Sequence, residues 1–325
     1  MTFCSNCGKE VPEDLKICDK CSMPIMDEEY LKLKAVNNFP GLFSDENLEK
    51  INTNFLTVDA YDMILGNILY LGKLNYLNLL SNIPEDIREN MDAFSKVVCI
   101  VEAFCNIHYK PCGSELGSYA FNHINLDDRL DKANQITTLI HELSHHLLAE
   151  IFEQVLIYLL EVKKSDASEA FVWFALITNL PNNLMNEYCA HSVEGRFSPY
   201  GYQNYGSFNI LLGNFDHTKE QDREIVDFNM AFGNSIANDI LDIIEEFIGR
   251  DLREEIKLEF KKNSSLPPRF DQIERETNII FPPELKVQMI NNVLIQAFNN
   301  GKDKKYRKTL NDFKKSYKVF NDMYK

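Results

Sequence analysis

Apolar residues recur at helical spacing along most of this chain, so the pattern predicts a largely helical protein. The clearest run predicts a helix over 132–163 that is packed by one face. Further helical patterns cover 46–110, with a break at Ile83-Pro84, then 167–180, 217–262 and a stretch after Phe281-Pro282-Pro283. The apolar positions of the 132–163 run are Ile136, Leu139, Ile140, Leu143, Leu147, Leu148, Ile151 and Val155.

Three other segments break the helical pattern. Within 113–128, Tyr119, Phe121 and Leu126 follow a rough alternation that predicts short strands, bounded by glycines and an Asp-Asp turn. Pro181 to Asn183 is expected to interrupt the chain, and the aromatic, glycine-rich segment 198–216 to form a loop. The predicted fold class is therefore α+β and mostly helical, with a small edge sheet just before the longest helix.

The longest predicted helix carries His141, Glu142 and His145, the H-E-x-x-H arrangement. Residues four apart share one helical face, so both imidazoles can bind one metal ion. Glu142 lies on the flank of that face, where it can act as a general base on a metal-bound water, as in zinc hydrolases. The alternative, two hydrogen-bonded histidines on a surface helix, is disfavoured because burying them without a partner costs stability.

A catalytic zinc site of this type needs a third protein ligand, and Glu187 is the expected one. His191 follows one turn later on the same face. It could be the ligand itself, orient a ligand, or stabilise the oxyanion in catalysis, and a tyrosine of 198–216 is another candidate for that last role. Glu194 is interpreted as a charge at a helix end, and His123 is not expected to bind metal.

Four cysteines near the start follow the spacing C-x2-C-x10-C-x2-C. Two such pairs give a closed tetrahedral site, so residues 1–25 are predicted to form a zinc ribbon with a structural ion. Its expected role is protein contact, because nearby acidic residues offset its lysines and leave no basic face for nucleic acid. The ribbon ligands are Cys4, Cys7, Cys18 and Cys21, and the cysteines expected to remain free thiols are Cys99, Cys105, Cys112 and Cys189.

Amino-acid composition and net charge also indicate the class of protein. The chain has 325 residues, 45% hydrophobic and 26% charged, with a formal net charge of −15, typical of a soluble globular protein. The negative charge disfavours nonspecific binding to nucleic acid or anionic membranes. We expect a cytoplasmic protein, because no signal peptide and no uncharged apolar run of about 18 residues stand out.

The predicted organisation has four parts. They are the ribbon at 1–25, a connector at 26–45, a metallopeptidase domain at 46–263, and a C-terminal helical region at 264–325 that ends in a basic tail.

The combination of His141-Glu142-x-x-His145 with Asn186-Glu187-x-x-Ala190 resembles the gluzincins, zinc peptidases whose third ligand is a helical glutamate. The run from Tyr119 to Leu148, with Val193 after the second motif, is similar to the ImmA/IrrE family of cytoplasmic peptidases that cut regulatory proteins. The likeness covers about 113–197, and an N-terminal ribbon is not typical of that family.

This resemblance implies a zincin-like fold in which His141, His145 and Glu187 hold a catalytic zinc and Glu142 serves as the base. The expected function is a zinc-dependent peptidase acting on a specific intracellular protein, with one catalytic and one structural zinc. The alternative is a non-catalytic regulatory or binding protein with two structural zinc sites.

Overall fold

The computed structural model describes residues 39–113, 115–199, 201–263 and 278–323, together with the short segments 2–3, 10–11 and 34–36. The ribbon cysteines Cys4, Cys7, Cys18 and Cys21 lie outside the described residues. The zinc ribbon therefore stays a prediction from the sequence.

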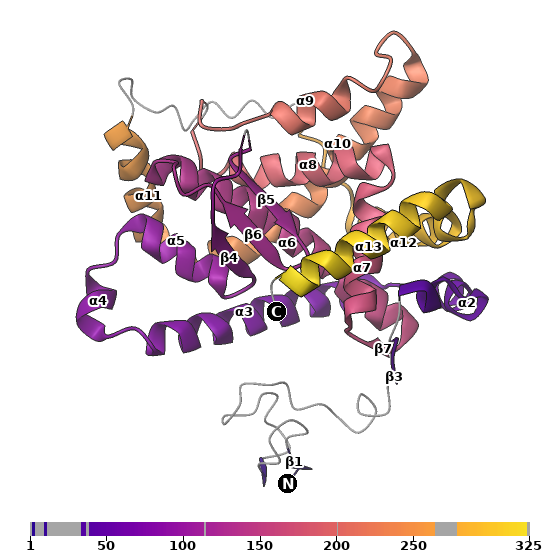
Figure 1. Cartoon of the computed structure of the whole chain (residues 1–325), viewed down its shortest axis with the longest axis horizontal. Coiled ribbons are helices and arrows are strands. Elements are labelled where there is room, and N and C mark those ends of the chain that lie inside the picture. Colours follow the sequence, from indigo (N-terminus) through magenta and orange to yellow (C-terminus); the bar gives the residue numbers. More distant parts are fainter. Residues whose placement is uncertain are drawn as a thin grey trace.

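The described chain is mostly helical with a three-stranded sheet, which confirms the predicted α+β class at this level (Figure 1). One main apolar core takes in residues from Phe39 to Phe313, so helices before and after residue 263 share it. The α-helices are α2 (Asp45–Thr53), α3 (Val58–Ser81), α4 (Glu85–Glu89), α5 (Ala93–Glu102), α6 (Lys132–Leu160), α7 (Asp166–Ile177), α8 (Leu180–Glu194), α9 (Gly206–Leu212), α10 (Glu220–Glu245), α11 (Arg250–Asn263), α12 (Pro283–Lys302) and α13 (Arg307–Met323). The 3-10 helices are η1 (Phe39–Phe43) and η2 (Lys304–Tyr306).

Helix α6 lies at the centre of the fold and confirms the helix predicted over 132–163 up to Leu160, whereas Val162–Lys163 form strand β7 instead. It begins where the Asp131 side chain accepts a hydrogen bond from the Asn134 amide, and it ends at Glu161, which adopts a left-handed φ of 52°. Helices α5, α7 and α8 and strands β5 and β6 contact it. By length and composition α6 could cross a membrane, but 72% of its most apolar window is buried inside the protein, as in the core helix of a soluble fold.

The three-stranded sheet has the order β4-β6-β5 and lies against α6. Strand β6 pairs parallel with β4 and antiparallel with β5, so β5 is an edge strand. The sequence pattern predicted strands in 113–128 correctly, but β4 corrects the helix expected to continue to residue 110. A four-residue, half-exposed strand is too short to show its own period. The strands are β4 (Asn106–Tyr109), β5 (Gly117–Ala120) and β6 (His123–Leu126), with two further pairs, β1 (Thr2–Phe3) with β2 (Glu10–Val11) and β3 (Lys34–Ala35) with β7 (Val162–Lys163).

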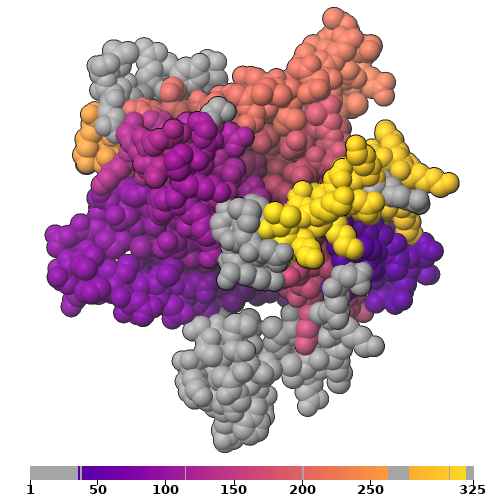
Figure 2. Space-filling model, in the orientation of Figure 1, coloured from indigo at the N-terminus to yellow at the C-terminus, as the bar shows by residue number. Residues whose placement is uncertain are grey.

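A tight turn at Phe121 and Asn122 fixes the β5–β6 hairpin. Both residues have positive φ, 47° and 64°, as a two-residue type I′ turn requires. Asn tolerates this conformation, whereas Phe121 needs support, and its ring packs against Trp173, Phe313 and Tyr317. The C-terminal helices, yellow in Figure 2, thus help to hold the edge strand in register.

Helix α8 lies between α6 and α10. Its first turn contains Pro181, which corrects the break expected at 181–183, because proline is tolerated at the first helical positions. At Gly233 of α10 a side-chain Cβ would lie 2.6 Å from the Met185 carbonyl oxygen of α8. The loop expected at 198–216 contains the short helix α9, which packs on α8.

We predict that Gly233→Ala destabilises the protein, because the methyl group must push α10 away from the α8 backbone. The expected loss is about 1–3 kcal/mol of unfolding free energy in urea titrations. Gly66→Ala is the matched control, since Gly66 is also helical but has no atom within 4 Å of the added Cβ. That variant should gain about 0.5–1 kcal/mol from helix propensity, and a Gly233 variant as stable as the Gly66 variant would contradict the close packing.

A partly buried cluster of charges lies beside α6, next to the edge strand. Lys164 pairs with Glu150 and with Glu153, the latter at 3.0 Å, and Glu169 lines the same small cavity. Burial raises the pKa of both Glu153 and Glu169 to about 7. His146 lies at the other side of this cavity, with its Nδ1 3.3 Å from the Tyr119 hydroxyl.

We predict that Glu169→Gln stabilises the protein at pH 8 and has little effect at pH 4.5. Because the folded pKa of Glu169 is about 7, above the unfolded value of 4.5, the unfolded state releases this proton first as pH rises. Folding therefore loses stability between those two pH values, and the amide abolishes that loss, a gain of roughly 1–3 kcal/mol. Urea titrations at both pH values test this, with Glu49→Gln on exposed α2 as control, and an equal gain at both pH values would refute it.

Candidate metal centre

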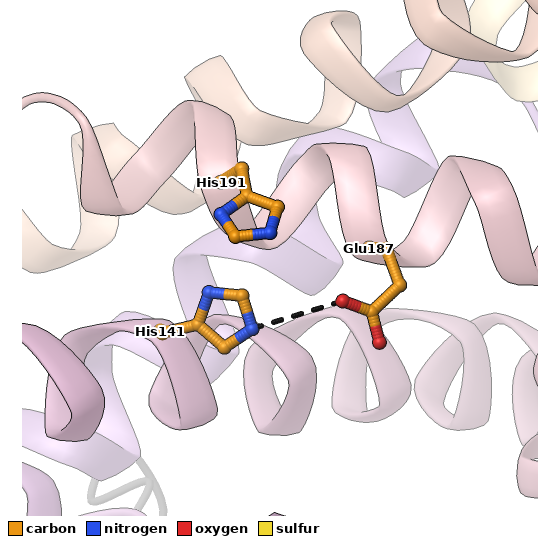
Figure 3. Close-up of side chains that lie close together, drawn as sticks. All are labelled: His141, Glu187 and His191. Carbon is orange, nitrogen blue, oxygen red and sulfur yellow. Dashed lines mark ion pairs between the residues drawn. The ribbon is translucent and has the colours of Figure 1, made fainter. Parts of the chain in front are cut away.

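Helices α6 and α8 bring the predicted ligands His141, His145 and Glu187 together. The two imidazole Nε2 atoms are 3.2 Å apart. Glu187 places Oε2 3.9 Å from Nε2 of His141 and Oε1 3.9 Å from Nε2 of His145. Figure 3 shows the His141 ring and the Glu187 carboxylate directed at each other across the space between the two helices.

These spacings suit one small metal ion. Ligand atoms at 2.0–2.1 Å from a tetrahedral zinc lie about 3.3 Å from one another. The His141–His145 separation is close to that value, and Glu187 reaches it by a small side-chain movement. The three residues can therefore hold a metal from one side and leave its other side open to the cleft.

His191 is close to the same point but is placed differently. One ligand atom from each of His141, Glu187 and His191 falls within 4.8 Å of the others, so His191 also belongs to the metal-competent group. However, its Nδ1 is 2.9 Å from Glu194, and its ring stacks on Tyr205 at 4.4 Å between centroids. The His141–His145–Glu187 set is the more compact of the two.

Two residues of α8 orient the histidine ligands. A single oxygen of Glu194 accepts hydrogen bonds from Nδ1 of His141 and of His191, both at 2.9 Å. The Asn186 amide oxygen accepts one from Nδ1 of His145 at 2.8 Å. These bonds favour the tautomer with the proton on Nδ1, which directs Nε2 towards a metal. His141, whose pKa is raised to about 9, would lose its second proton from Nε2 when a metal binds.

Sequence reasoning missed both orienting residues. Glu194 does end α8, as interpreted, but it is buried and binds two histidines instead of lying free as a terminal charge. The signal for it was the spacing of Glu187, His191 and Glu194, which places all three on one helical face. Asn186 carried no such signal, because its role depends on how α8 crosses α6.

The centre carries more negative than positive charge. Burial opposes protonation of His141, yet Glu194, Glu142 and Glu187 together raise its pKa to about 9. Burial lowers the pKa of His145 to about 4, so this ring is neutral at pH 7. Among the described residues that line the cleft there is no lysine or arginine. A bound cation would balance the surplus charge.

Two buried atoms of this centre have no hydrogen-bond partner among the described residues. They are Oε2 of Glu187 and Nε2 of His191. Buried polar atoms are rarely left unpaired, because the lost hydration is not compensated. For Glu187, a metal held with His141 and His145 would supply the interaction, so the residues present fit a bound ion.

Glu142 and the edge strand line an open cleft of about 510 Å³ above the ligands. Burial raises the pKa of Glu142 to about 7. Strand β5 approaches α6 closely at Gly117, where a Cβ would lie 2.5 Å from Thr138 and 3.5 Å from the Glu142 carboxylate. A glycine is therefore required where the strand passes the base.

The structure thus brings together His141, Glu142, His145, Glu187 and His191, whereas the four ribbon cysteines lie outside the described residues. His123, on β6, contacts His108 at 2.8 Å. No family model, no curated protein and no solved structure matches the chain.

We predict that Glu194→Gln weakens metal binding at this centre about 10–100-fold, the usual cost of removing a carboxylate that orients a histidine ligand. A competitive chelator titration measures the affinity. Glu224→Gln, on the exposed surface of α10, is the matched control. Equal affinities for the two variants would show that Glu194 does not act on the ligands.

Proposed function

We propose that this protein is a zinc-dependent peptidase of the gluzincin type. The observation that carries the proposal is the arrangement of His141, His145 and Glu187 at near-tetrahedral spacing, with the buried carboxyl group of Glu142 beside them in an open cleft. Two imidazoles and one carboxylate are the donor set of a catalytic zinc with three protein ligands.

Zinc bound there would polarise a substrate carbonyl and lower the pKa of a water molecule. Glu142 then accepts a proton from the attacking water and delivers it to the leaving amine. Its raised pKa, near 7, suits a group that must both take up and release a proton near neutral pH.

Strand β5 supports a peptide as the substrate. It is the outer strand of the sheet, and Gly117, Ser118 and Tyr119 line the cleft above the metal centre. An extended peptide can add to such an edge through main-chain hydrogen bonds. This placement holds the scissile bond over the ligands without requiring a particular sequence.

His191 acts as a positioning residue in this proposal. It shares one oxygen of Glu194 with His141, and the two rings lie 4.6 Å apart between centroids. Among the described residues, the cleft lining does not include His191. Tyr202 lines the cleft, but its hydroxyl donates to the Phe260 carbonyl oxygen at 3.4 Å, so it would have to leave that partner to stabilise an oxyanion.

The resemblance to the ImmA/IrrE family adds the expectation of an intracellular regulatory protein as substrate. The four-cysteine ribbon would hold a second, structural zinc and make protein contacts. These parts of the proposal rest on the sequence motifs. The proposed enzyme is cytoplasmic, with nucleic acid and membranes not expected as partners.

We predict that Glu142→Gln abolishes peptide hydrolysis, by about 100-fold or more, and leaves the metal content unchanged, because the amide cannot accept the proton. Hydrolysis of a casein substrate by purified protein, with and without chelator, and metal analysis of both proteins test this. If the variant hydrolyses casein as fast as the original chain, Glu142 is not the base. If neither protein hydrolyses any substrate tested, the alternative of a non-catalytic binding protein gains support.

We predict that Glu187→Ala lowers the metal content of the chain by about one equivalent, since two imidazoles alone bind zinc weakly. Metal analysis after dialysis against a weak chelator measures the loss. Glu115→Ala, at the edge of the same cleft, is the control and should retain its metal. Unchanged metal in the Glu187 variant would assign the third ligand to another residue, with His191 the first candidate.

A further inference from the structure

The cleft over the metal centre has two chemically different ends. Because His141 lies opposite Glu194 and His145 lies opposite Asn186, α6 and α8 run antiparallel. Strand β5 runs along α6 in the same direction, with Gly117 next to Thr138 and Tyr119 next to His146. The long axis of the cleft therefore follows α6, and the candidate ligands His141 and His145 lie between its two ends.

The end beyond His145 is largely apolar, with Asn183 of α8 as a polar residue in its lining. The Tyr119 ring contacts Trp173 of α7, with ring centroids 5.3 Å apart. Ile177, also of α7, lines the same cleft. Helix α9 supplies the opposite wall. It runs along α8 towards the start of that helix, because Tyr205 stacks on His191 and Phe208, further along α9, packs against Tyr188 at 5.5 Å between centroids.

The direction of α9 places Ile210 over the same end of the cleft as Trp173 and Ile177. Ile210 lines the cleft and is 73% exposed, a large apolar side chain that α9 does not bury in its own cluster. Exposed apolar side chains grouped around a cleft commonly mark a binding surface.

The opposite end of the cleft, before His141, is polar and acidic. Glu115 stands at the start of β5, and Thr138 and Asn204 line the cleft near it. With no lysine or arginine among the described lining residues, nothing there would pair with an acidic side chain. The two ends therefore differ in what they can accept.

We infer that the cleft end formed by Trp173, Ile177 and Ile210 is a subsite that selects a large apolar side chain of the peptide substrate. The inference rests on the proposed peptidase function, and it adds the class of residue that flanks the cleaved bond. Burying such a side chain between two isoleucines and an indole removes apolar surface from water. An acidic side chain would lose hydration and meet no lysine or arginine among the described lining residues, and a polar one would gain at most a bond to the Asn183 amide.

The test uses Trp173, which is the single tryptophan of the chain and so reports directly on this end of the cleft. The zinc-loaded Glu142→Gln protein is titrated with capped six-residue Ala/Gly peptides that carry one Phe, Asn or Asp, moved through each position. At one position we expect the Phe peptide to bind at least about tenfold more tightly than the Asn and Asp peptides, and to shift the emission of Trp173.

Two substitutions connect the preference to the cleft. Ile210→Ser and Ile177→Asn, each made in the Glu142→Gln protein, should reduce the Phe preference to less than about threefold. Ile279→Ser, which changes an isoleucine of similar exposure outside the cleft, should leave it intact. Equal affinity for the Phe and Asn peptides, absence of binding at millimolar peptide, or a preference that survives both cleft substitutions would overturn the subsite.

Digestion of the same peptides by the original chain separates this inference from the proposed function. Cleavage next to Phe, and not next to Asn or Asp, agrees with both. Cleavage without preference contradicts the subsite and leaves the peptidase intact. Selective binding without any cleavage supports the subsite and refutes the peptidase.

Discussion

The contact between α6 and α8 buries more charge than a helix pair ordinarily tolerates, and most features of this protein follow from that. Glu142, Glu187 and Glu194 lie within one small region with the imidazoles of His141 and His145. Burial, together with repulsion from the other carboxylates, raises the pKa of Glu142 to about 7, and the hydrogen bond and charge of Glu194 raise that of His141 to about 9 against the effect of burial. A divalent cation is the simplest group that balances this charge and also satisfies the unpaired oxygen of Glu187.

Packing from the rest of the protein fixes the distance between α6 and α8. Helix α10 supports α8 from behind through the close approach at Gly233, and the Thr137 and Ser198 hydroxyls, 2.8 Å apart, connect the two sides of the centre at its polar end. Glu194 and Asn186 then set the ring orientations from the same helix that supplies Glu187. Because one helix carries a ligand and both orienting groups, a shift of α8 along α6 would misplace all three together. Tight packing behind α8 would thus be a requirement of the candidate metal centre as much as of stability.

Much of the fold and of the candidate metal centre could be predicted from the sequence, and the parts that could not have physical reasons. The apolar period located α6, and the positions of His141, Glu142 and His145 on one face follow directly from helical geometry. Glu187 could be chosen because a zinc site lacked a third ligand. The role of Asn186 could not, since it depends on how two helices cross. Strand β4 and helix α9 were missed because four and seven residues span too little of any period, and the glycines and aromatics around α9 favour a loop locally. The tertiary contacts of Phe208 with Tyr188 stabilise α9 instead.

The edge strand shows how the fold reconciles a closed core with an open site. If β5 lay further across α6, it would cover the helix face that carries His141 and His145. If it lay further away, a peptide paired with it would not reach Glu142. Gly117 allows β5 to pass within van der Waals contact of Thr138, while the turn at Phe121, supported by Trp173 and α13, fixes how far the strand extends. Trp173 therefore has two functions: its edge packs against the hairpin and its remaining surface lines the cleft. In the proposed mode of binding, Trp173 contacts both the edge strand and the substrate, which would couple peptide binding to the position of β5.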